Sequence, residues 1–161
     1  MNKGSALRSA NAALALAIVL AATGDARGQA QVAAPTVTAG AAANIEGWIE
    51  GVVGTPVVGG KIAVGGWAGD RKKGAPVAKV EVFLDGKPEA VATINVTRAD
   101  VAKVVGRLDY AQSGWNAVLN LDRVSPGAHT ISAIASDAAG NKQALKGEKK
   151  IDVKPAAATG P

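Results

Sequence analysis

The chain has 161 residues, of which only 3% are aromatic and none is cysteine. The lack of cysteine excludes disulfide staples, thiolate metal sites and cysteine nucleophiles, so apolar burial and strand pairing must stabilise the fold. The formal net charge is +5, but the positive residues are scattered along the chain. Nucleic-acid binding favours a basic stripe with interleaved aromatic side chains, so we expect no nucleic-acid partner.

Residues 1–30 have the pattern of a secretory signal peptide. Lys3 and Arg8 precede an apolar run, and the small residues Gly28 and Ala30 suit cleavage after Ala30. The run is shorter than the about 20 residues that a membrane-spanning helix needs, and no later segment is apolar enough to span a bilayer. The sequence predicts export to the periplasm, the cell surface or the medium, with an uncleaved N-terminal anchor as the alternative.

Two segments rich in alanine, threonine and proline flank the part of the chain that is expected to fold. Residues 31–43 are predicted to be a flexible linker, and residues 154–161 a disordered tail. Neither segment has enough large apolar side chains to fold alone. The folded domain is therefore expected to cover residues 44–153.

Within this domain, short strand patterns alternate with turn signals. The clearest pattern places Val80, Val82 and Leu84 on one face, and Asp85-Gly86 then reverses the chain into a return strand. Several short strands separated by turns predict an all-β fold, an antiparallel sandwich of about seven strands. The predicted strands cover residues 45–53, 61–67, 77–84, 87–96, 114–121, 129–136 and 143–153.

One insert interrupts the strands. Val101, Val104 and Val105 have the spacing of a short helix over residues 97–105, and Thr97 is the expected N-terminal cap. A loop continues from this helix to residue 113. We expect any site of the domain where this insert meets the Asp85-Gly86 turn or the loop at residues 71–73.

Four stretches carry a resemblance to a known family: residues 62–68, 77–86, 113–121 and 126–141, the last ending in an Asp-x-x-Gly-Asn turn. In these stretches the chain resembles bacterial Ig-like domains of exported and surface proteins. The resemblance implies a β-sandwich that acts as a spacer, an adhesion unit or an accessory binding module. It implies no ligand and no catalytic residue.

Aromatic and basic side chains are the candidate ligand contacts. Trp115 has the alternation of a core residue, whereas the glycines beside Trp48 and Trp67 leave room for an exposed indole ring. With Tyr110, these two tryptophans form a candidate platform for stacking on a sugar. The densest basic cluster, in a predicted loop, is the second candidate contact and consists of Arg71, Lys72 and Lys73.

Catalytic and metal chemistry have weaker support. His129 is the sole histidine, and an enzyme would need it to converge with Asp109 and Ser113. Aspartates near predicted loops offer oxygen ligands for calcium, but hydrogen bonding to the turn backbone is the preferred interpretation. These aspartates are Asp70, Asp85, Asp109, Asp122 and Asp137, the last of which has Asn141 as its best local partner.

No catalytic residue, metal site or cofactor is therefore predicted. We predict a non-enzymatic module that contacts another protein or the cell envelope through an edge strand or a loop. The expected partner is an envelope or extracellular protein, or a glycan, whose identity the sequence leaves open. The alternative is a small carbohydrate-binding module that uses Trp48 or Trp67.

Overall fold

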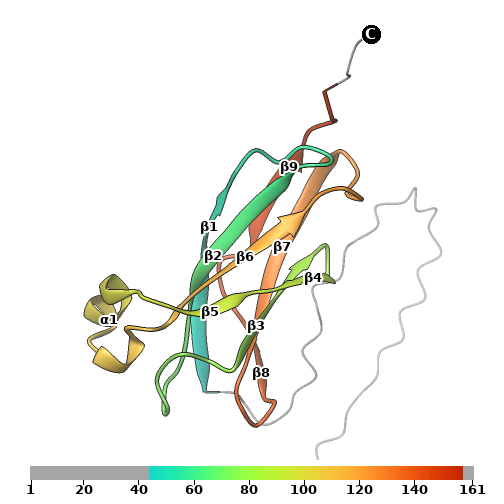
Figure 1. The fold of residues 1–161 in the computed structure, drawn as a ribbon. Helices are drawn as coiled ribbons and strands as arrows, with labels where there is room; N and C mark the ends of the chain where they lie inside the picture. The colour runs from blue at the N-terminus through green and yellow to red at the C-terminus, as the bar shows by residue number, and fades with distance from the viewer. Residues whose placement is uncertain (1–43, 158–161) are drawn as a thin grey trace, which may run out of the picture. The chain divides into compact units, whose positions relative to one another are not determined.

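The computed structural model describes residues 44–157, and the predicted signal peptide, its cleavage site and the linker lie outside this range. The described residues form nine strands, one α-helix and one 3-10 helix (Figure 1). None of these helices is long and apolar enough to cross a membrane. The elements are β1 (Ile45–Val53), β2 (Lys61–Asp70), β3 (Lys79–Leu84), β4 (Lys87–Val91), β5 (Thr93–Val96), α1 (Ala99–Val105), η1 (Leu108–Tyr110), β6 (Gly114–Asn120), β7 (Gly127–Ser136), β8 (Lys142–Ala144) and β9 (Lys149–Val153).

The strands form two antiparallel sheets. The four-stranded sheet has the order β1-β2-β6-β5, and the five-stranded sheet has the order β4-β3-β7-β8, with β9 also paired to β7. If β4 is taken as strand C′, β8 and β9 together as strand G, and the remaining strands are lettered along the chain, the first sheet is ABED and the second is C′CFG. This is the strand order of an immunoglobulin-like sandwich, and it confirms the predicted fold class.

The core lies between the two sheets and comes from the alternation along each strand. Val80, Val82 and Leu84 of β3 are all buried, as their period-two spacing predicts. The same holds for the inward face of β6, where Trp115 is 2% exposed. The prediction that Trp115 is a core residue is therefore confirmed.

Two of the predicted strands are each broken in two. The return strand predicted over residues 87–96 separates at Ala92, so that β4 stays beside β3 whereas β5 crosses to β6 in the other sheet. Pro88 has no backbone N–H to donate, which suits the edge position of β4. The strand predicted over residues 143–153 likewise separates into β8 and β9, both paired to β7. Lys154, predicted to belong to the tail, exchanges backbone hydrogen bonds with Pro56 and Val58.

The helical insert is present, but its predicted cap is wrong. The residue that precedes α1 is Arg98, which makes no side-chain capping bond, and the Thr97 hydroxyl instead lies 3.4 Å from the Gln112 amide oxygen. Gly106 ends the helix with φ of 72°, in the left-handed region that glycine enters readily. The predicted apolar face is also partly wrong, because Val104 is 86% exposed.

Candidate functional site

The insert packs on the outer face of the four-stranded sheet, at the end where Trp67 projects. Val101, Ala102 and Tyr110 form a small apolar cluster of their own, against which Trp67 and Val105 pack. The Tyr110 and Trp67 ring centroids are 6.2 Å apart with the planes tilted by 59°, a favourable aromatic geometry. Tyr110 is fully buried, so it belongs to the packing of the insert and lies away from the surface.

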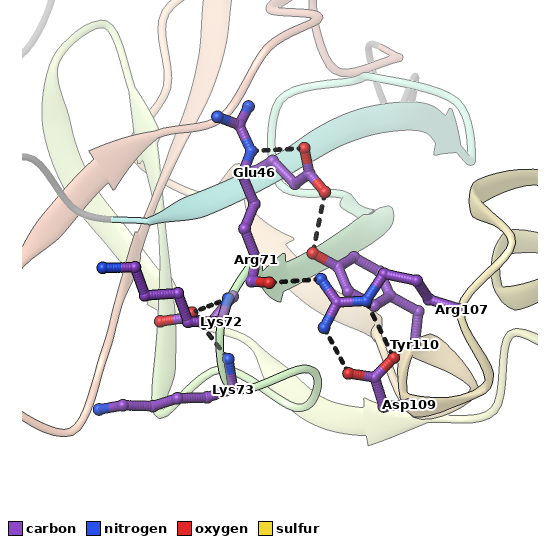
Figure 2. A network of polar contacts seen from close by, with 8 residues as sticks. Glu46, Arg71, Lys72, Lys73, Arg107, Asp109 and Tyr110 are labelled. Atoms are coloured by element: carbon purple, nitrogen blue, oxygen red, sulfur yellow. Dashed lines mark hydrogen bonds and ion pairs between the residues drawn. The ribbon is translucent and has the colours of Figure 1, made fainter.

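A polar network joins this cluster to the sheet and to the loop after β2 (Figure 2). The Tyr110 hydroxyl donates to Glu46 of β1 at 2.8 Å, and Arg71 Nε donates to the other oxygen of the same carboxylate at 2.8 Å. Arg107 donates to the Arg71 carbonyl at 2.6 Å and stacks 4.6 Å above the Tyr110 ring. The insert therefore meets the loop at residues 71–73, one of the two places where we expected a site.

The network shifts the acidity of its members. Burial alone would raise the pKa of Glu46, but hydrogen bonds from Arg71 and Tyr110 hold that pKa below its usual value. Burial and the neighbouring Glu46 carboxylate together raise the pKa of the Tyr110 hydroxyl well above its usual range. At neutral pH, Tyr110 is therefore a neutral donor to an ionised Glu46.

The basic loop contributes two side chains that extend away from this network. The backbone N–H groups of Lys72 and Lys73 donate to the Asp70 carboxylate at 2.7 and 3.0 Å, which fixes the turn. Figure 2 shows both lysine side chains directed away from Arg107 and Tyr110. Arg71 is different, because its guanidinium is paired with Glu46.

The three tryptophans have three different environments. Trp48 and Trp67 face each other directly across β1 and β2, so the two Gly-Trp pairs of the sequence are cross-strand neighbours. Trp67 is partly covered by the insert, whereas Trp48 is 44% exposed and the Lys146 ammonium lies 5.9 Å from its ring centroid. The expected platform of Trp48, Trp67 and Tyr110 is therefore reduced to the exposed ring of Trp48.

The residues considered for catalysis are not brought together. The Asp109 carbonyl accepts from Ala75, just before β3, whereas His129 lies at the start of β7. Lys79 at the start of β3 pairs with Ser136 at the end of β7, so Asp109 and His129 lie at opposite ends of the sandwich. A strand rises about 3.3 Å per residue, which puts them on the order of 20 Å apart.

Four of the five loop aspartates accept hydrogen bonds from backbone or side-chain groups: Asp70, Asp85, Asp109 and Asp137. Asp137 accepts from the backbone of Ala139 and from both nitrogens of Asn141, each at 2.9 Å. These bonds lower the pKa of Asp137, the side-chain bond from Asn141 most. Within residues 44–157, no three acidic or histidine side chains are grouped to hold a metal ion.

One contact of the candidate residues was missed by the sequence analysis. The Asp85 carboxylate binds His129 Nδ1 at 2.5 Å and the Thr130 N–H at 2.9 Å, while His129 Nε2 lies 2.7 Å from the Ser125 carbonyl. Both ring nitrogens face acceptors, so the doubly protonated imidazolium satisfies both. The Asp85–His129 pair links the β3–β4 turn to the start of β7. Because both ring nitrogens of His129 are hydrogen-bonded, neither is free to act as a catalytic base.

A cleft of about 570 Å³ lies beside the Asp85–His129 pair. Charges of both signs line it, including Lys87 and Arg123 against Glu89 and Asp122. Because these charges balance, the cleft favours neither an anionic nor a cationic ligand.

The outer face of the four-stranded sheet carries a second surface that the sequence analysis missed. Two rows of outward-facing residues cross β1, β2 and β6 in register. We call Val53, Ala63 and Val118 the valine row, and Gly51, Gly65 and Asn116 the glycine row. Neither row contains a charged residue, and Val53 and Val118 are 73% and 60% exposed. A groove of about 260 Å³ includes Gly51, Gly65 and Val53 in its lining, together with the ion-paired Glu50 and Arg98.

Most glycines of this sheet are explained by close neighbours that leave no room for a side chain. A Cβ on Gly66 would lie 1.9 Å from the Trp48 carbonyl, and a Cβ on Gly69 would lie 2.5 Å from the Tyr110 ring. Gly51 is different: a Cβ there has nothing within 4 Å, and the backbone is not left-handed. Glycine inside a strand costs stability and often marks a bulge or a place where a ligand or another backbone approaches closely. Gly51 directly follows a shift in the register of β1 against β2, between Ile49 and Gly51.

The outer face of the five-stranded sheet has the opposite character. Lys79 and Glu81 of β3 project there and form an ion pair at 2.7 Å, and the Lys142 ammonium lies 4.0 Å from the same carboxylate. Lys150 of β9 pairs in register with the outward-facing Thr130. Charges of this kind keep a sheet surface solvated, so the valine row and the glycine row of the other sheet stand out as a candidate interaction surface.

Comparison with known proteins adds little to this description. No family model and no curated protein matches the chain. A solved structure of the fibronectin(III)-like modules of Clostridium thermocellum CbhA is 16% identical, with a TM-score of 0.41, and the likeness covers 70% of this chain and 98% of that chain. We base no conclusion on this likeness, and the fold assignment rests on the strand order of the two sheets.

Proposed function

We propose that this chain is an exported, non-catalytic interaction module of the periplasm, the cell surface or the medium. It binds another macromolecule through the valine and glycine rows of the four-stranded sheet. The observation that carries the proposal is the exposure of Val53 and Val118 on a sheet face whose two central rows have no charge. Exposed apolar surface of this kind marks interaction sites on soluble domains.

The two rows have the features of a binding surface. Burying a valine side chain contributes roughly 1.5–3 kcal/mol, so Val53 and Val118 supply an apolar anchor of a few kcal/mol. The glycine row lets a partner approach the backbone: a Cβ at Gly51 would meet nothing within 4 Å, and one at Gly65 would meet only the Trp115 carbonyl at 3.3 Å and Asn116 Cβ at 3.9 Å. The insert covers the Trp67 end of the same face and bounds the surface there.

A photo-cross-linking residue at Val118 tests this proposal in cells. We expect it to capture a specific envelope or extracellular macromolecule, because Val118 lies in the contact surface. The matched control places the same residue at Ala144, which is exposed on β8 of the other sheet. Equal capture at both positions, or none at Val118, would contradict the proposal.

The second candidate function is carbohydrate binding by Trp48, favoured by the 44% exposure of its ring. Stacking of a sugar on the indole would quench or shift its fluorescence. We expect any glycan response to disappear in Trp48→Phe if this ring is the binding site. A response that survives in Trp48→Phe, or no response in the parent protein, argues against this function.

A further inference from the structure

The His129 ring lies between two acceptors that belong to different parts of the fold. Its Nδ1 is 2.5 Å from the Asp85 carboxylate in the β3–β4 turn, and its Nε2 is 2.7 Å from the Ser125 carbonyl. Ser125 belongs to the connection between β6 and β7, residues 122–126, which we call the β6–β7 segment. The ring is only 11% exposed and joins the turn to this segment.

A neutral His129 can keep only one of these two contacts. Neutral imidazole has one N–H and one nitrogen lone pair, whereas both groups that face the ring are acceptors. The Asp85 carboxylate is ionised, and a hydrogen bond to a charged group is stronger than one to a neutral carbonyl. The neutral ring therefore keeps its N–H on Nδ1, and the lone pair on Nε2 then faces and repels the Ser125 carbonyl.

The turn has further bonds to β7, whereas the β6–β7 segment depends on His129. The Asp85 N–H donates to the Thr130 carbonyl at 2.8 Å, and the Thr130 N–H donates to the Asp85 carboxylate at 2.9 Å. Within residues 44–157, the other hydrogen bonds of the segment reach no farther than Asn120 and Leu121. Loss of the Ser125 contact therefore detaches the segment from β7 and leaves the turn in place.

The β6–β7 segment forms one wall of the cleft of about 570 Å³, which the Asp85–His129 pair also lines. We propose that the contact between His129 and Ser125 is a proton-dependent switch that sets the position of this wall. The imidazolium holds the segment against β7, and the neutral ring releases it. The half-buried Val124 still packs against the core, so the released segment loosens locally and the domain stays folded.

The other charges near the ring do not outweigh Asp85. The charged residues that line the cleft around His129 are Lys87 and Glu89 of β4 and Asp122 and Arg123 of the segment, and their charges balance. The residue of β9 that pairs with His129 is the apolar Ile151. Burial would lower the pKa of His129, but its bonds to Asp85 and Ser125 raise that pKa above 6.5. The segment is therefore held below pH 6.5 and released as the pH rises through the raised pKa.

NMR of the protein as the cell exports it tests the switch. The ring signals of His129 give the midpoint of its titration. Relaxation of the Cα carbons, which amide exchange at high pH does not disturb, then reports the order of residues 122–126 one pH unit below and one above this midpoint. We expect the segment to lose order above the midpoint, while Gly86 in the turn keeps its order. A segment equally ordered at both pH values, a turn that loosens with it, or a midpoint below pH 6.5 overturns the inference.

Asp85→Asn separates the hydrogen-bond argument from a general effect of pH. An asparagine amide can accept from the Thr130 N–H with its oxygen and donate to His129 Nδ1 with its nitrogen. Neutral His129 then keeps its N–H on Nε2 and its bond to Ser125. We therefore expect the His129 midpoint to fall by about one pH unit or more, and the segment to stay ordered above it.

His129→Gln is the matched control, because its side chain does not titrate. We expect the order of the β6–β7 segment in this variant to be the same at both pH values. A segment that loosens above the midpoint in Asp85→Asn as it does in the parent protein overturns the inference. The same conclusion follows if the pH dependence of the segment persists in His129→Gln.

Discussion

Replacing Tyr110 by alanine is expected to lower the free energy of unfolding by about 3–5 kcal/mol, the usual cost of truncating a buried aromatic side chain. Tyr110 is fully buried between the insert and the sheet, where it contacts Trp67 and lies against Gly69. Its loss leaves a cavity and also removes the hydroxyl donor to Glu46. Urea denaturation, followed by tryptophan fluorescence, measures the change.

Tyr110→Phe is the matched control for this experiment. It keeps the ring in place and removes only the hydroxyl, so we expect a loss of about 1.5–3 kcal/mol, the usual value of one hydrogen bond to a charged group. Hydrogen exchange gives a second readout, in which the amides of α1 lose protection in Tyr110→Ala and keep it in Tyr110→Phe. A cost below about 1 kcal/mol for the alanine variant would show that the insert is not anchored by this side chain.

Replacing Asp85 by asparagine is expected to destabilise the domain by about 1–3 kcal/mol near pH 5 and by less at higher pH. Asp85 has φ of 49°, which asparagine tolerates well, so the variant preserves the turn and removes only the charge. The lost interaction is the partly buried pair with His129, whose side chain is 11% exposed. Removing a hydrogen-bonded charge partner from a buried group has a cost of this order.

The pH dependence follows from both pKa shifts. Burial would lower the pKa of His129, but hydrogen bonds to Asp85 and Ser125 raise it above its ordinary value of 6.5. The contribution of His129 is therefore complete below pH 6.5 and is lost as the pH rises through the raised pKa. Burial would raise the pKa of Asp85, but its bonds to His129 and Thr130 lower it below 3.8, so its contribution is lost only as the pH falls through that lowered pKa.

Unfolding of the parent protein and of Asp85→Asn at pH 5, 7 and 9 measures this linkage. The difference in unfolding free energy between the two should be largest at pH 5 and smallest at pH 9. An NMR titration of His129, the sole histidine of the chain, gives its pKa directly. A difference that stays constant from pH 5 to pH 9 would contradict the assignment of a protonated His129.

The sequence predicts the sandwich well because alternation is a local signal. The period-two pattern of Val80, Val82 and Leu84 and that of the Trp115 strand both identify buried faces correctly. The division of residues 87–96 between two sheets was missed, because a strand that changes sheets keeps the same alternation on both sides of Ala92. Only the pairing partners differ, and these are far away in the sequence.

The candidate site is less predictable for the same reason. Tyr110 and Arg71 were selected as surface contacts, yet the network that holds them depends on Glu46, which lies 64 residues from Tyr110. The exposed valines of the outer face carry the same residue type as the core, so composition cannot separate them. One local signal was available: Gly51 lies inside a predicted strand, where glycine is unfavourable and calls for an explanation.

The central claim is that Gly51 leaves this face bare for a partner, because a Cβ there would meet no neighbouring atom of the fold. The stability of Gly51→Ala tests this claim most directly, with Gly69→Ala as the control. A Cβ at Gly51 meets nothing within 4 Å, whereas one at Gly69 lies 2.5 Å from the Tyr110 ring. We predict that Gly51→Ala raises the free energy of unfolding by about 0.5–1 kcal/mol, while Gly69→Ala lowers it by about 1–3 kcal/mol. A loss of more than about 1 kcal/mol in Gly51→Ala, a typical destabilisation for a point mutation, would show that the fold itself requires this glycine and would contradict the account.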